Sequence, residues 1–464
     1  MSLTYQGQTH PDQTPASSHR EEIKAALRYS TVDGMAYASM IGFGEHYIVA
    51  YAVALRATSL QIGLLCAAPS LLAALAQTKS ADMARALGSR KAIVLIFALL
   101  QGLMWLPIMV IPFVFATSPG WWLIAFVTMY TAFGAVVTPC WASTMAEVVP
   151  DRLRGEYFGR RGSLSTLASI IVFLVAGIFL YYFTGELLVA FAALFGAAFF
   201  SRLVSWVFLT KLPEFSPTVK KEEPLKPGAF VKVLTGTNLG RAMAFLILMS
   251  FVVNIASPYF AVYMLRDLGL SYLAFAILET CSSVATLLTL THWGEAADKV
   301  GNFKMLAIAS IMVPLVPLIW LASDNLIYLG IVQLFTGFAW AGFNLCSVNF
   351  LYDATSARNR TVYLSYFNAL NGIAASLGAI IGGYSAPYLP ILFGYGTLTL
   401  FLISGYLRGI VSMAFLPEIK EVRRVSAIKA TQLFHILMAG RPVNRRASHR
   451  RVAHIHAHRN RAAA

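Results

Sequence analysis

The sequence predicts an all-α polytopic membrane protein with twelve transmembrane helices in two pseudo-symmetric six-helix bundles. Of its 464 residues, 58% are hydrophobic and only 12% are charged, whereas soluble domains have about 45–50% apolar and about 25% charged residues. Apolar runs of about 20 residues, long enough to cross a hydrocarbon core roughly 30 Å thick, follow one another almost end to end. Landmarks of the first half return in the second, since Leu212-Pro213-Glu214 recurs as Leu416-Pro417-Glu418.

The order of the spans sets the domain organisation. Each span must be helical, because lipid offers no hydrogen-bond partner to a free backbone amide. A polar segment (1–28) precedes a first bundle (29–212), and a charged, proline-containing linker (213–239) leads to a second bundle (240–418) and a basic tail (419–464). The twelve expected spans lie near residues 29–54, 59–78, 92–116, 121–145, 163–184, 187–210, 240–264, 270–292, 304–322, 325–350, 362–386 and 391–416.

Charge in the short loops predicts the orientation. One set of loops is strongly basic, and the other carries only Arg56 and Arg266. Because cytoplasmic loops of membrane proteins hold the excess of Lys and Arg, we expect a multi-pass membrane protein with both termini cytoplasmic. The basic loops carry Lys79, Arg85, Arg90, Lys91, Arg152, Arg154, Arg160, Arg161, Lys299, Lys304, Arg358 and Arg360.

A short polar hinge separates two apolar runs in each half. A tight turn suits glycine, and an aspartate at a helix end can pair with a basic group nearby. Such a pair either latches one conformation at a two-state interface, or the basic residues serve only as topology signals. The second-half hinge contains Gly294, Asp298, Lys299, Gly301 and Lys304, and a weaker first-half copy contains Asp82, Gly88, Arg90 and Lys91. Further along, Glu147, Arg154 and Tyr157 recur as Asp353, Arg360 and Tyr363.

Two six-helix halves with this hinge between the second and third helix of each resemble the major facilitator superfamily. The stretch from Gly294 to Lys304 is similar to that family's loop motif, Gly-x-x-x-Asp-Arg/Lys-x-Gly-x-x-Arg/Lys, while the first-half copy lacks the leading glycine and a basic residue directly after Asp82. The resemblance, which is to a little-characterised bacterial branch of the family, covers about residues 29–418. It implies the major facilitator fold and a location in the bacterial inner membrane. It also implies secondary transport of a small molecule by alternating access, with the substrate near the midplane between the halves. Helices 1, 4, 7 and 10 line that cavity in this family, with contributions from 2, 5, 8 and 11.

Polar side chains follow helical spacing in three spans that would line such a cavity. They either form a wet, polar substrate path or hold neighbouring helices together by hydrogen bonds. The tenth span presents Gln333, Gly337, Trp340 and Asn344 on one face, the seventh contains Asn254, and the eleventh contains Asn368 and Asn371.

Two carboxylates lie well inside predicted spans, Glu45 in the first and Glu279 in the eighth. An unpaired carboxylate at that depth is costly, so it is protonated, paired or in contact with water. Both are therefore candidates for proton coupling, and a structural ion pair or hydrogen bond is the alternative. His46 is a third candidate, although neighbours on a helix point about 100° apart, so we expect it to face a different space from Glu45.

Three further charges lie in or at the edge of spans. We expect Arg202 and Arg408, at equivalent positions of the sixth and twelfth spans, to reach the membrane surface by snorkelling and to act as anchors. Asp33, at the cytoplasmic edge of the first span, either stabilises the helix start or joins an inner gate.

Several functions are not expected. The sequence contains no Walker, zincin or nucleophile-elbow motif, so we expect no enzyme. The four cysteines all lie within spans and form neither a disulfide framework nor a close-spaced metal site, so no cofactor or metal is expected. The expected partners are a small-molecule substrate and the lipid bilayer, with anionic lipid at the basic tail. We expect a monomer that binds no nucleic acid. A transporter-like membrane sensor or assembly partner without transport activity is the alternative function.

Overall fold

The computed structural model describes residues 15–115, 117–150, 153–213, 236–355, 360–392 and 394–423. In this part of the chain the backbone is helical, with short connections and one isolated bridge between Leu392 and Tyr395. Most of the linker (213–239) and of the tail (419–464) lies outside the described residues.

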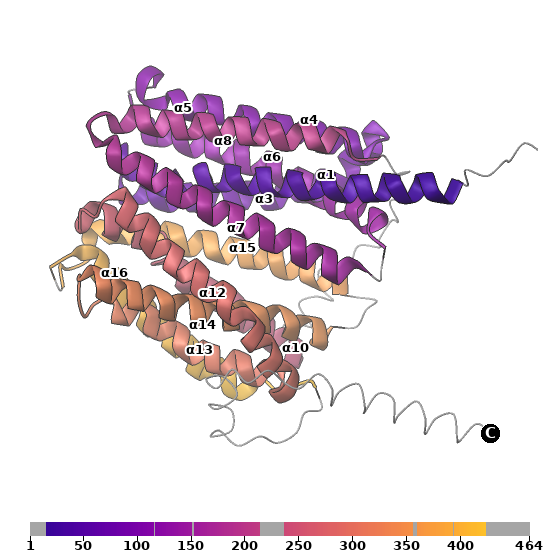
Figure 1. The fold of residues 1–464 in the computed structure, drawn as a ribbon. Helices are drawn as coiled ribbons and strands as arrows, with labels where there is room; N and C mark the ends of the chain where they lie inside the picture. Colours follow the sequence, from indigo (N-terminus) through magenta and orange to yellow (C-terminus); the bar gives the residue numbers. More distant parts are fainter. Residues whose placement is uncertain are drawn as a thin grey trace, which may run out of the picture.

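The N-terminal half forms one bundle, coloured indigo to magenta in the upper part of Figure 1. Its elements are α1 (Pro15–Phe43), the 3-10 turn η1 (Glu45–Tyr47), α2 (Ile48–Ala54), α3 (Ser59–Leu87), α4 (Arg90–Leu103), α5 (Trp105–Val114), α6 (Pro119–Val148), α7 (Arg154–Tyr182), η3 (Thr184–Glu186) and α8 (Leu187–Thr210).

The C-terminal half forms the second bundle, coloured orange to yellow below the first. Its elements are α10 (Asn238–Asn254), α11 (Tyr259–Val262), the π-helical turn η4 (Tyr263–Asp267), α12 (Tyr272–Val300), α13 (Asn302–Ile319), α14 (Leu326–Ala354), α15 (Arg360–Ser385), η5 (Ala386–Tyr388), α16 (Gly396–Phe415) and η6 (Leu416–Glu418).

Eleven helical stretches in the described residues are long and apolar enough to cross a membrane, and they match the second to twelfth expected spans. The first span is interrupted, because α1 ends at Phe43 and α2 resumes after η1. At the break, a Cβ atom on Gly44 would lie 2.3 Å from Trp105 Cη2. Since α1 packs along α7 and α8, α1 crosses the membrane beside the other helices. The prediction of twelve helices in two bundles is confirmed. The helix begins at Pro15, inside the polar segment expected to precede it.

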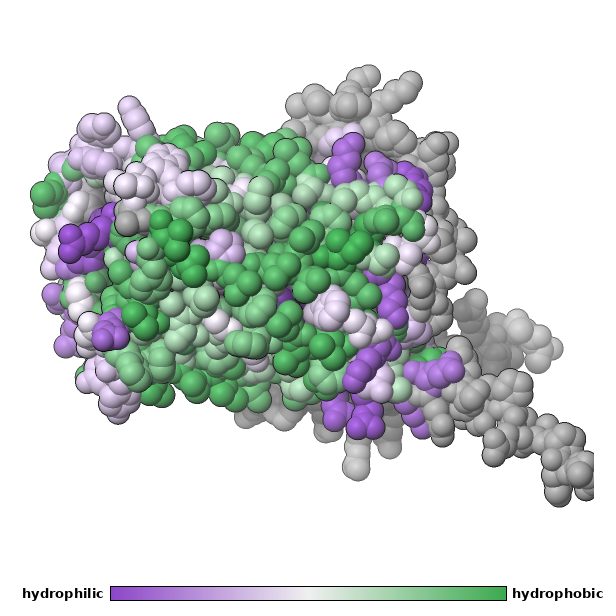
Figure 2. All heavy atoms as spheres, turned by 90° about the horizontal axis from the view of Figure 1, so that it is seen from above, coloured by the Kyte–Doolittle hydropathy of each residue, from purple (hydrophilic) through white to green (hydrophobic). Residues whose placement is uncertain are grey.

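The surface of the molecule fits a lipid environment. Figure 2 shows a broad apolar belt between two more polar ends. On α7, the exposed side chains Leu167, Ile171, Val175 and Ile178 follow helical spacing along one face. Because a helix in lipid has to present apolar groups outward, this face of α7 is a lipid-facing face.

The hinges are tight turns that glycine makes possible. Gly88 ends α3 with a φ of 66°, and the Ser89 side chain then caps α4 by accepting a hydrogen bond from Ala92 N at 3.0 Å. Gly301 alone separates α12 from α13, with a φ of 109°. These positive φ values are easy for glycine and strained for other residues. We call the end of the molecule that contains these two glycines the basic end, and the opposite end the far end.

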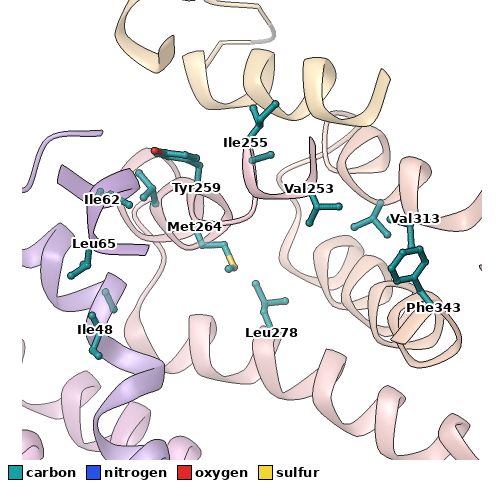
Figure 3. Packing of buried hydrophobic residues seen from close by; sticks show 14 of the residues in the cluster. Ile48, Ile62, Leu65, Val253, Ile255, Tyr259, Met264, Leu278, Val313 and Phe343 are labelled. Atoms are coloured by element: carbon teal, nitrogen blue, oxygen red, sulfur yellow. The ribbon is translucent and has the colours of Figure 1, made fainter. Parts of the chain in front are cut away.

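The two bundles meet along α3 with α15 and along α7 with α12. Buried apolar residues from the far half of the first bundle belong to one continuous cluster with those of the second. Figure 3 shows this region, where Tyr259 lies beside Ile62, and Leu65 and Met264 belong to the same cluster. The basic half of the first bundle has a separate cluster around Ile93. The apolar core therefore joins the bundles at the far end.

Both ends of the described chain lie at the basic end (Figure 1). Near the start of α1, Tyr157 OH donates a hydrogen bond to Leu27 O at 3.2 Å. After η6, Arg423 Nη1 lies 3.1 Å from Asp298 Oδ1 beside the second hinge. An even number of membrane crossings requires both ends of the chain to lie on the same side of the membrane.

Candidate functional site

Hydrogen bonds close the two bundles against each other at the far end. Tyr259 OH, from α11, donates to Ser59 O at the start of α3 over 3.1 Å. Ser376 Oγ, from α15, lies 3.1 Å from Ala67 O of α3 and 2.8 Å from Gly372 O of its own helix, so its single proton is shared between these two acceptors. Each contact joins a side chain of the second bundle to the backbone of the first, so both must break if the bundles separate at this end.

Small residues and aromatic rings complete this closure. A Cβ atom on Gly63 would lie 2.4 Å from Ala379 O, so α3 and α15 approach more closely than any larger residue at 63 would allow. The ring of Phe275 lies 6.2 Å from that of Tyr47 and 6.0 Å from that of Phe173, measured between centroids. The far end is therefore closely packed.

A central cavity lies between the bundles on the basic side of this closure. It consists of two adjoining spaces of about 340 Å³ each, both lined by His46, Ile170 and Ser283. One space also contacts Cys66 and Glu279, and the other reaches Arg161 nearer the basic end. Lining residues thus come from both bundles and extend from the closed end toward the basic end.

His46 faces the first-bundle side of this cavity. Its Nε2 lies 3.3 Å from Ser169 Oγ of α7, and its ring centroid lies 5.0 Å from that of Phe173. Glu45 points elsewhere, into the first bundle, where Tyr130 OH donates to its Oε1 over 2.5 Å. Glu45 does not line the central cavity, and its contact with Tyr130 is of the structural kind.

Glu279 lies at a boundary between two spaces. It lines the central cavity and also a chamber of about 180 Å³ inside the second bundle, which we call the C-bundle chamber. Gln333 Nε2, from α14, donates to Glu279 Oε1 over 3.1 Å. Trp340 lines the same chamber, so three residues that the sequence singled out on two different helices come together here.

The remaining amides are more scattered. Asn254 lines the central cavity, and its Nδ2 donates to Ser250 O over 2.8 Å. Asn344 and Asn368 are exposed, and Asn371 is half-buried. None of these last three is among the residues lining the cavities described above.

The expectation that Arg202 and Arg408 snorkel to the membrane surface is wrong. Both side chains point into their own bundles, and they are 3% and 1% exposed. Arg408 lines the C-bundle chamber and donates to Ser404 Oγ over 3.1 Å. Arg202 Nη1 donates to Ser205 Oγ over 2.8 Å. These serines lie three and four residues from the arginines, on the same helix face, and would have indicated from sequence that this face turns inward.

Asp33 belongs to the first bundle's interior. Ser205 Oγ donates to its Oδ1 over 2.7 Å, and Arg161 Nη2 lies 3.3 Å from its Oδ2. Arg161, which the sequence analysis assigned only to a basic loop, thus connects α7 to α1 beside the central cavity.

The first-half hinge makes its ionic contacts within the first bundle. Arg85 forms an exposed ion pair with Asp82 one helical turn away. Arg90 Nη1 lies 2.6 Å from Glu147 Oε1 at the end of α6, and the Arg90 side chain is only 6% exposed. The first pair lies within α3 and the second ties α4 to α6, so neither joins the two bundles.

In the second-half hinge, Arg423 supplies the partner. Its Nη1 lies 3.1 Å from Asp298 Oδ1, and its Nε lies 2.7 Å from Asp353 Oδ2 at the end of α14. Asn302 Nδ2 donates to the same carboxylate over 2.5 Å, and Phe303 N donates to Glu421 Oε2 over 2.8 Å. The segment after η6 therefore fastens this hinge to its own bundle. Of the other motif residues, Gly294 has space for a Cβ atom, which would lie 3.6 Å from Leu345 Cδ2, while Lys299 is exposed and Lys304 is half-buried.

Arg154 and Arg360 play equivalent parts in the two halves. Arg154 Nη2 donates to Ala146 O, near the end of α6, over 2.5 Å. Arg360 Nη2 donates to Tyr352 O, near the end of α14, over 3.1 Å. A cation at the carbonyl end of a helix is favourable, because it satisfies free carbonyls and complements the helix dipole.

Two six-helix bundles that close at one end around a central cavity are an architecture typical of membrane transporters. The chain belongs to the Major Facilitator Superfamily, whose family model matches residues 34–278 and 242–452. This membership confirms the resemblance carried by the hinge motif and points to a transporter rather than an enzyme. A comparison with curated proteins found no match.

Solved structures of transporters share the fold. The nucleoside transporter NupG is 15% identical with a TM-score of 0.66, over 86% of this chain and 100% of that one. A bacterial homolog of the human lysosomal transporter Spinster, in an inward-facing and unoccupied conformation, is 14% identical with a TM-score of 0.63, over 88% and 100%. The xylose transporter XylE from E. coli, in an inward-open conformation, is 14% identical with a TM-score of 0.62, over 89% and 99%. At these identities the likeness shows the fold alone.

Proposed function

We propose that the protein is a secondary active transporter that moves a small molecule through the central cavity by alternating access, coupled to protons through Glu279. The observation that carries this proposal is the position of Glu279, which is the carboxylate among the residues lining the central cavity. A carboxylate that meets a wet cavity on one side and a protein chamber on the other can exchange a proton as the accessible side changes.

The described state is the inward-facing one under this proposal. The far end is held shut by Tyr259, Ser376 and the rings around Phe275, and the cavity lining continues toward Arg161 at the basic end. Because basic loops face the cytoplasm, the basic end and both termini are cytoplasmic in a bacterial inner membrane. A monomeric state and binding of anionic lipid by the tail stay predictions.

The hinge contacts favour gating by rigid bundles. Arg90 with Glu147, and Arg423 with Asp298 and Asp353, each bind helices of one bundle to one another. They therefore keep each bundle rigid while it rocks, and we assign the latch between bundles to the far-end contacts instead. The amides Asn254 and Gln333 and the indole of Trp340 supply hydrogen-bonding groups along or beside the substrate path.

The test needs a ligand first. A screen of the purified protein against metabolites and drugs by thermal stabilisation identifies a binding compound, and its flux is then measured in proteoliposomes with and without a proton gradient. Glu279→Gln should abolish gradient-driven accumulation and retain exchange of the compound across the membrane. Glu45→Gln is the matched control, because Glu45 lies outside the cavity lining, and it should retain accumulation.

Two results would contradict the proposal. Gradient-driven accumulation that survives in Glu279→Gln would remove Glu279 from proton coupling. Specific binding without any flux above that of protein-free liposomes would instead favour the transporter-like sensor or assembly partner.

A further inference from the structure

A second chamber lies inside the first bundle. It has a volume of about 200 Å³, and its lining includes Gln101, Trp141 and Arg202. Tyr37 and Arg161 line both this chamber and the central cavity, so they form the wall between the two spaces. We call this space the N-bundle chamber. It is far larger than the roughly 10–15 Å³ that a single water needs.

Two deeply buried side chains in this lining have unused hydrogen-bonding atoms. Arg202 is 3% exposed and Gln101 is 2% exposed. Within the described residues, Arg202 Nε has no acceptor and Gln101 Oε1 has no donor. A buried polar atom without a partner costs about 1–3 kcal/mol, so an occupant that supplies one acceptor and one donor would be stabilising.

Two glycines on neighbouring helices leave room for the side chains of Arg202 and Gln101. A Cβ atom on Gly102 of α4 would lie 3.1 Å from Arg202 Cγ. A Cβ atom on Gly134 of α6 would lie 2.4 Å from Gln101 Nε2. Larger residues at these two positions would therefore displace the polar pair, and the two glycines are part of how the chamber is built.

The chamber lining carries more positive than negative charge. Asp33 interacts with both guanidinium groups. It forms an ion pair with Arg161 directly and is connected to Arg202 through the hydroxyl of Ser205. Glu45 also interacts electrostatically with Arg202, but its carboxylate is held by Tyr130 and does not line the chamber. Asp33 is thus the one carboxylate among the lining residues of the chamber, against the two guanidinium groups of Arg161 and Arg202.

We propose that the N-bundle chamber binds the carboxylate of a small α-hydroxy or α-amino acid. The planar guanidinium of Arg202 accepts this group, because its donors match the two oxygens of a carboxylate. Gln101 Oε1 accepts a hydrogen bond from the hydroxyl or ammonium group of the same ligand. The ligand enters from the central cavity past Tyr37 and Arg161. This site is separate from Glu279, and its occupation does not depend on proton coupling.

The test uses four probes of one carbon skeleton: lactate, alanine, propionate and lactamide. Binding to the purified full-length protein is measured by calorimetry at constant ionic strength. We expect saturable binding of lactate or alanine, binding of propionate weaker by about tenfold because Gln101 stays unpaired, and no measurable binding of the neutral lactamide. Comparing the affinity for lactate with the affinity for alanine shows whether the site prefers a hydroxy acid or an amino acid.

Variants locate the binding to this chamber. Arg202→Lys keeps the positive charge but loses the planar guanidinium with its paired N–H donors, and it should weaken binding by at least about tenfold. Gln101→Leu should abolish the preference over propionate. Arg241→Lys, a surface change in the second bundle, is the control and should bind as the wild type does. Because the ranking of the four probes on the wild-type protein needs no variant, the test survives a variant that fails to fold.

The proposal would be overturned by absence of saturable lactate and alanine binding, by lactamide binding as tightly as lactate, or by wild-type affinity in a folded Arg202→Lys protein. The first result would mean that the chamber binds neither acid, and the other two that Arg202 does not recognise a carboxylate there. None of them bears on flux through the central cavity, and loss of proton coupling in Glu279→Gln would leave this binding unchanged.

Discussion

Removing the hydroxyl of Tyr259 should loosen the closure at the far end. In Tyr259→Phe the ring can keep its packing, but the hydrogen bond to Ser59 O, 3.1 Å long in the described state, is lost. A hydrogen bond of this kind contributes about 1 kcal/mol net, because the hydroxyl is hydrated when the end opens. That energy corresponds to about a fivefold change in the equilibrium between closed and open far ends. An open fraction of about 5% would become about 20%.

Distances between spin labels report this equilibrium directly. Tyr182 in α7 and Tyr388 in η5 are each 76% exposed and lie at the far end, one in each bundle. With both replaced by cysteine and labelled, double electron–electron resonance gives the populations of short and long distances. The native cysteines Cys66, Cys140, Cys281 and Cys346 are first replaced by serine.

Tyr51→Phe is the matched control. Its hydroxyl also donates to a backbone carbonyl, that of Ile108 over 3.2 Å, but both residues belong to the first bundle. This variant should lose comparable stability and leave the distance populations unchanged. The reasoning would be refuted by an unchanged distribution in Tyr259→Phe, or by the same shift in both variants.

Two further predictions concern the second-half hinge. Gly301→Ala should lower the free energy of unfolding by about 1–3 kcal/mol, because φ there is 109° and a Cβ would lie 2.2 Å from Glu421 Oε2. Gly294→Ala should be tolerated, since its Cβ would only touch Leu345 at 3.6 Å; equal thermal unfolding midpoints would contradict this contrast. Arg423→Gln should cost about 1 kcal/mol. The pKa of Arg423 is raised, chiefly by its hydrogen bond to Asp353, so its contribution is complete below its unfolded pKa, far above neutrality. The cost should therefore be constant between about pH 6 and 9, and a cost that vanishes at about pH 9 would contradict the assignment.

The sequence predicted the features that lipid and duplication impose. An apolar span must be a helix, so the spans could be located from composition. Arg154 and Arg360 recur because each caps the helix before it, and their structural roles agree. What composition could not predict is the break after Phe43, or the close approach there of Trp105, from another helix, to Gly44.

The direction in which a charged side chain points was the weakest part of the sequence analysis. Arg202 and Arg408 were expected to reach water, but each is enclosed by its own bundle. Spacing alone does not say which face of a helix meets lipid. The serines on the same faces, Ser205 and Ser404, carried that information.

Contacts between residues far apart in the sequence could not be predicted either. The charge of Arg423 was counted as part of a basic tail, whereas it binds Asp298 and Asp353. Gln101 was not singled out at all, because one amide in an apolar span has no periodic pattern. Only the fold shows that it shares a chamber with Arg202.

The accessibility of Cys66 tests most directly whether the central cavity is closed at the far end and reached from the basic end. Cys66 is half-buried and lines this cavity, and a protein with serine at 140, 281 and 346 isolates it. A membrane-impermeant maleimide should modify it rapidly in inside-out vesicles, where the basic end faces the reagent, and slowly in right-side-out vesicles. Rapid modification only in right-side-out vesicles would contradict the account.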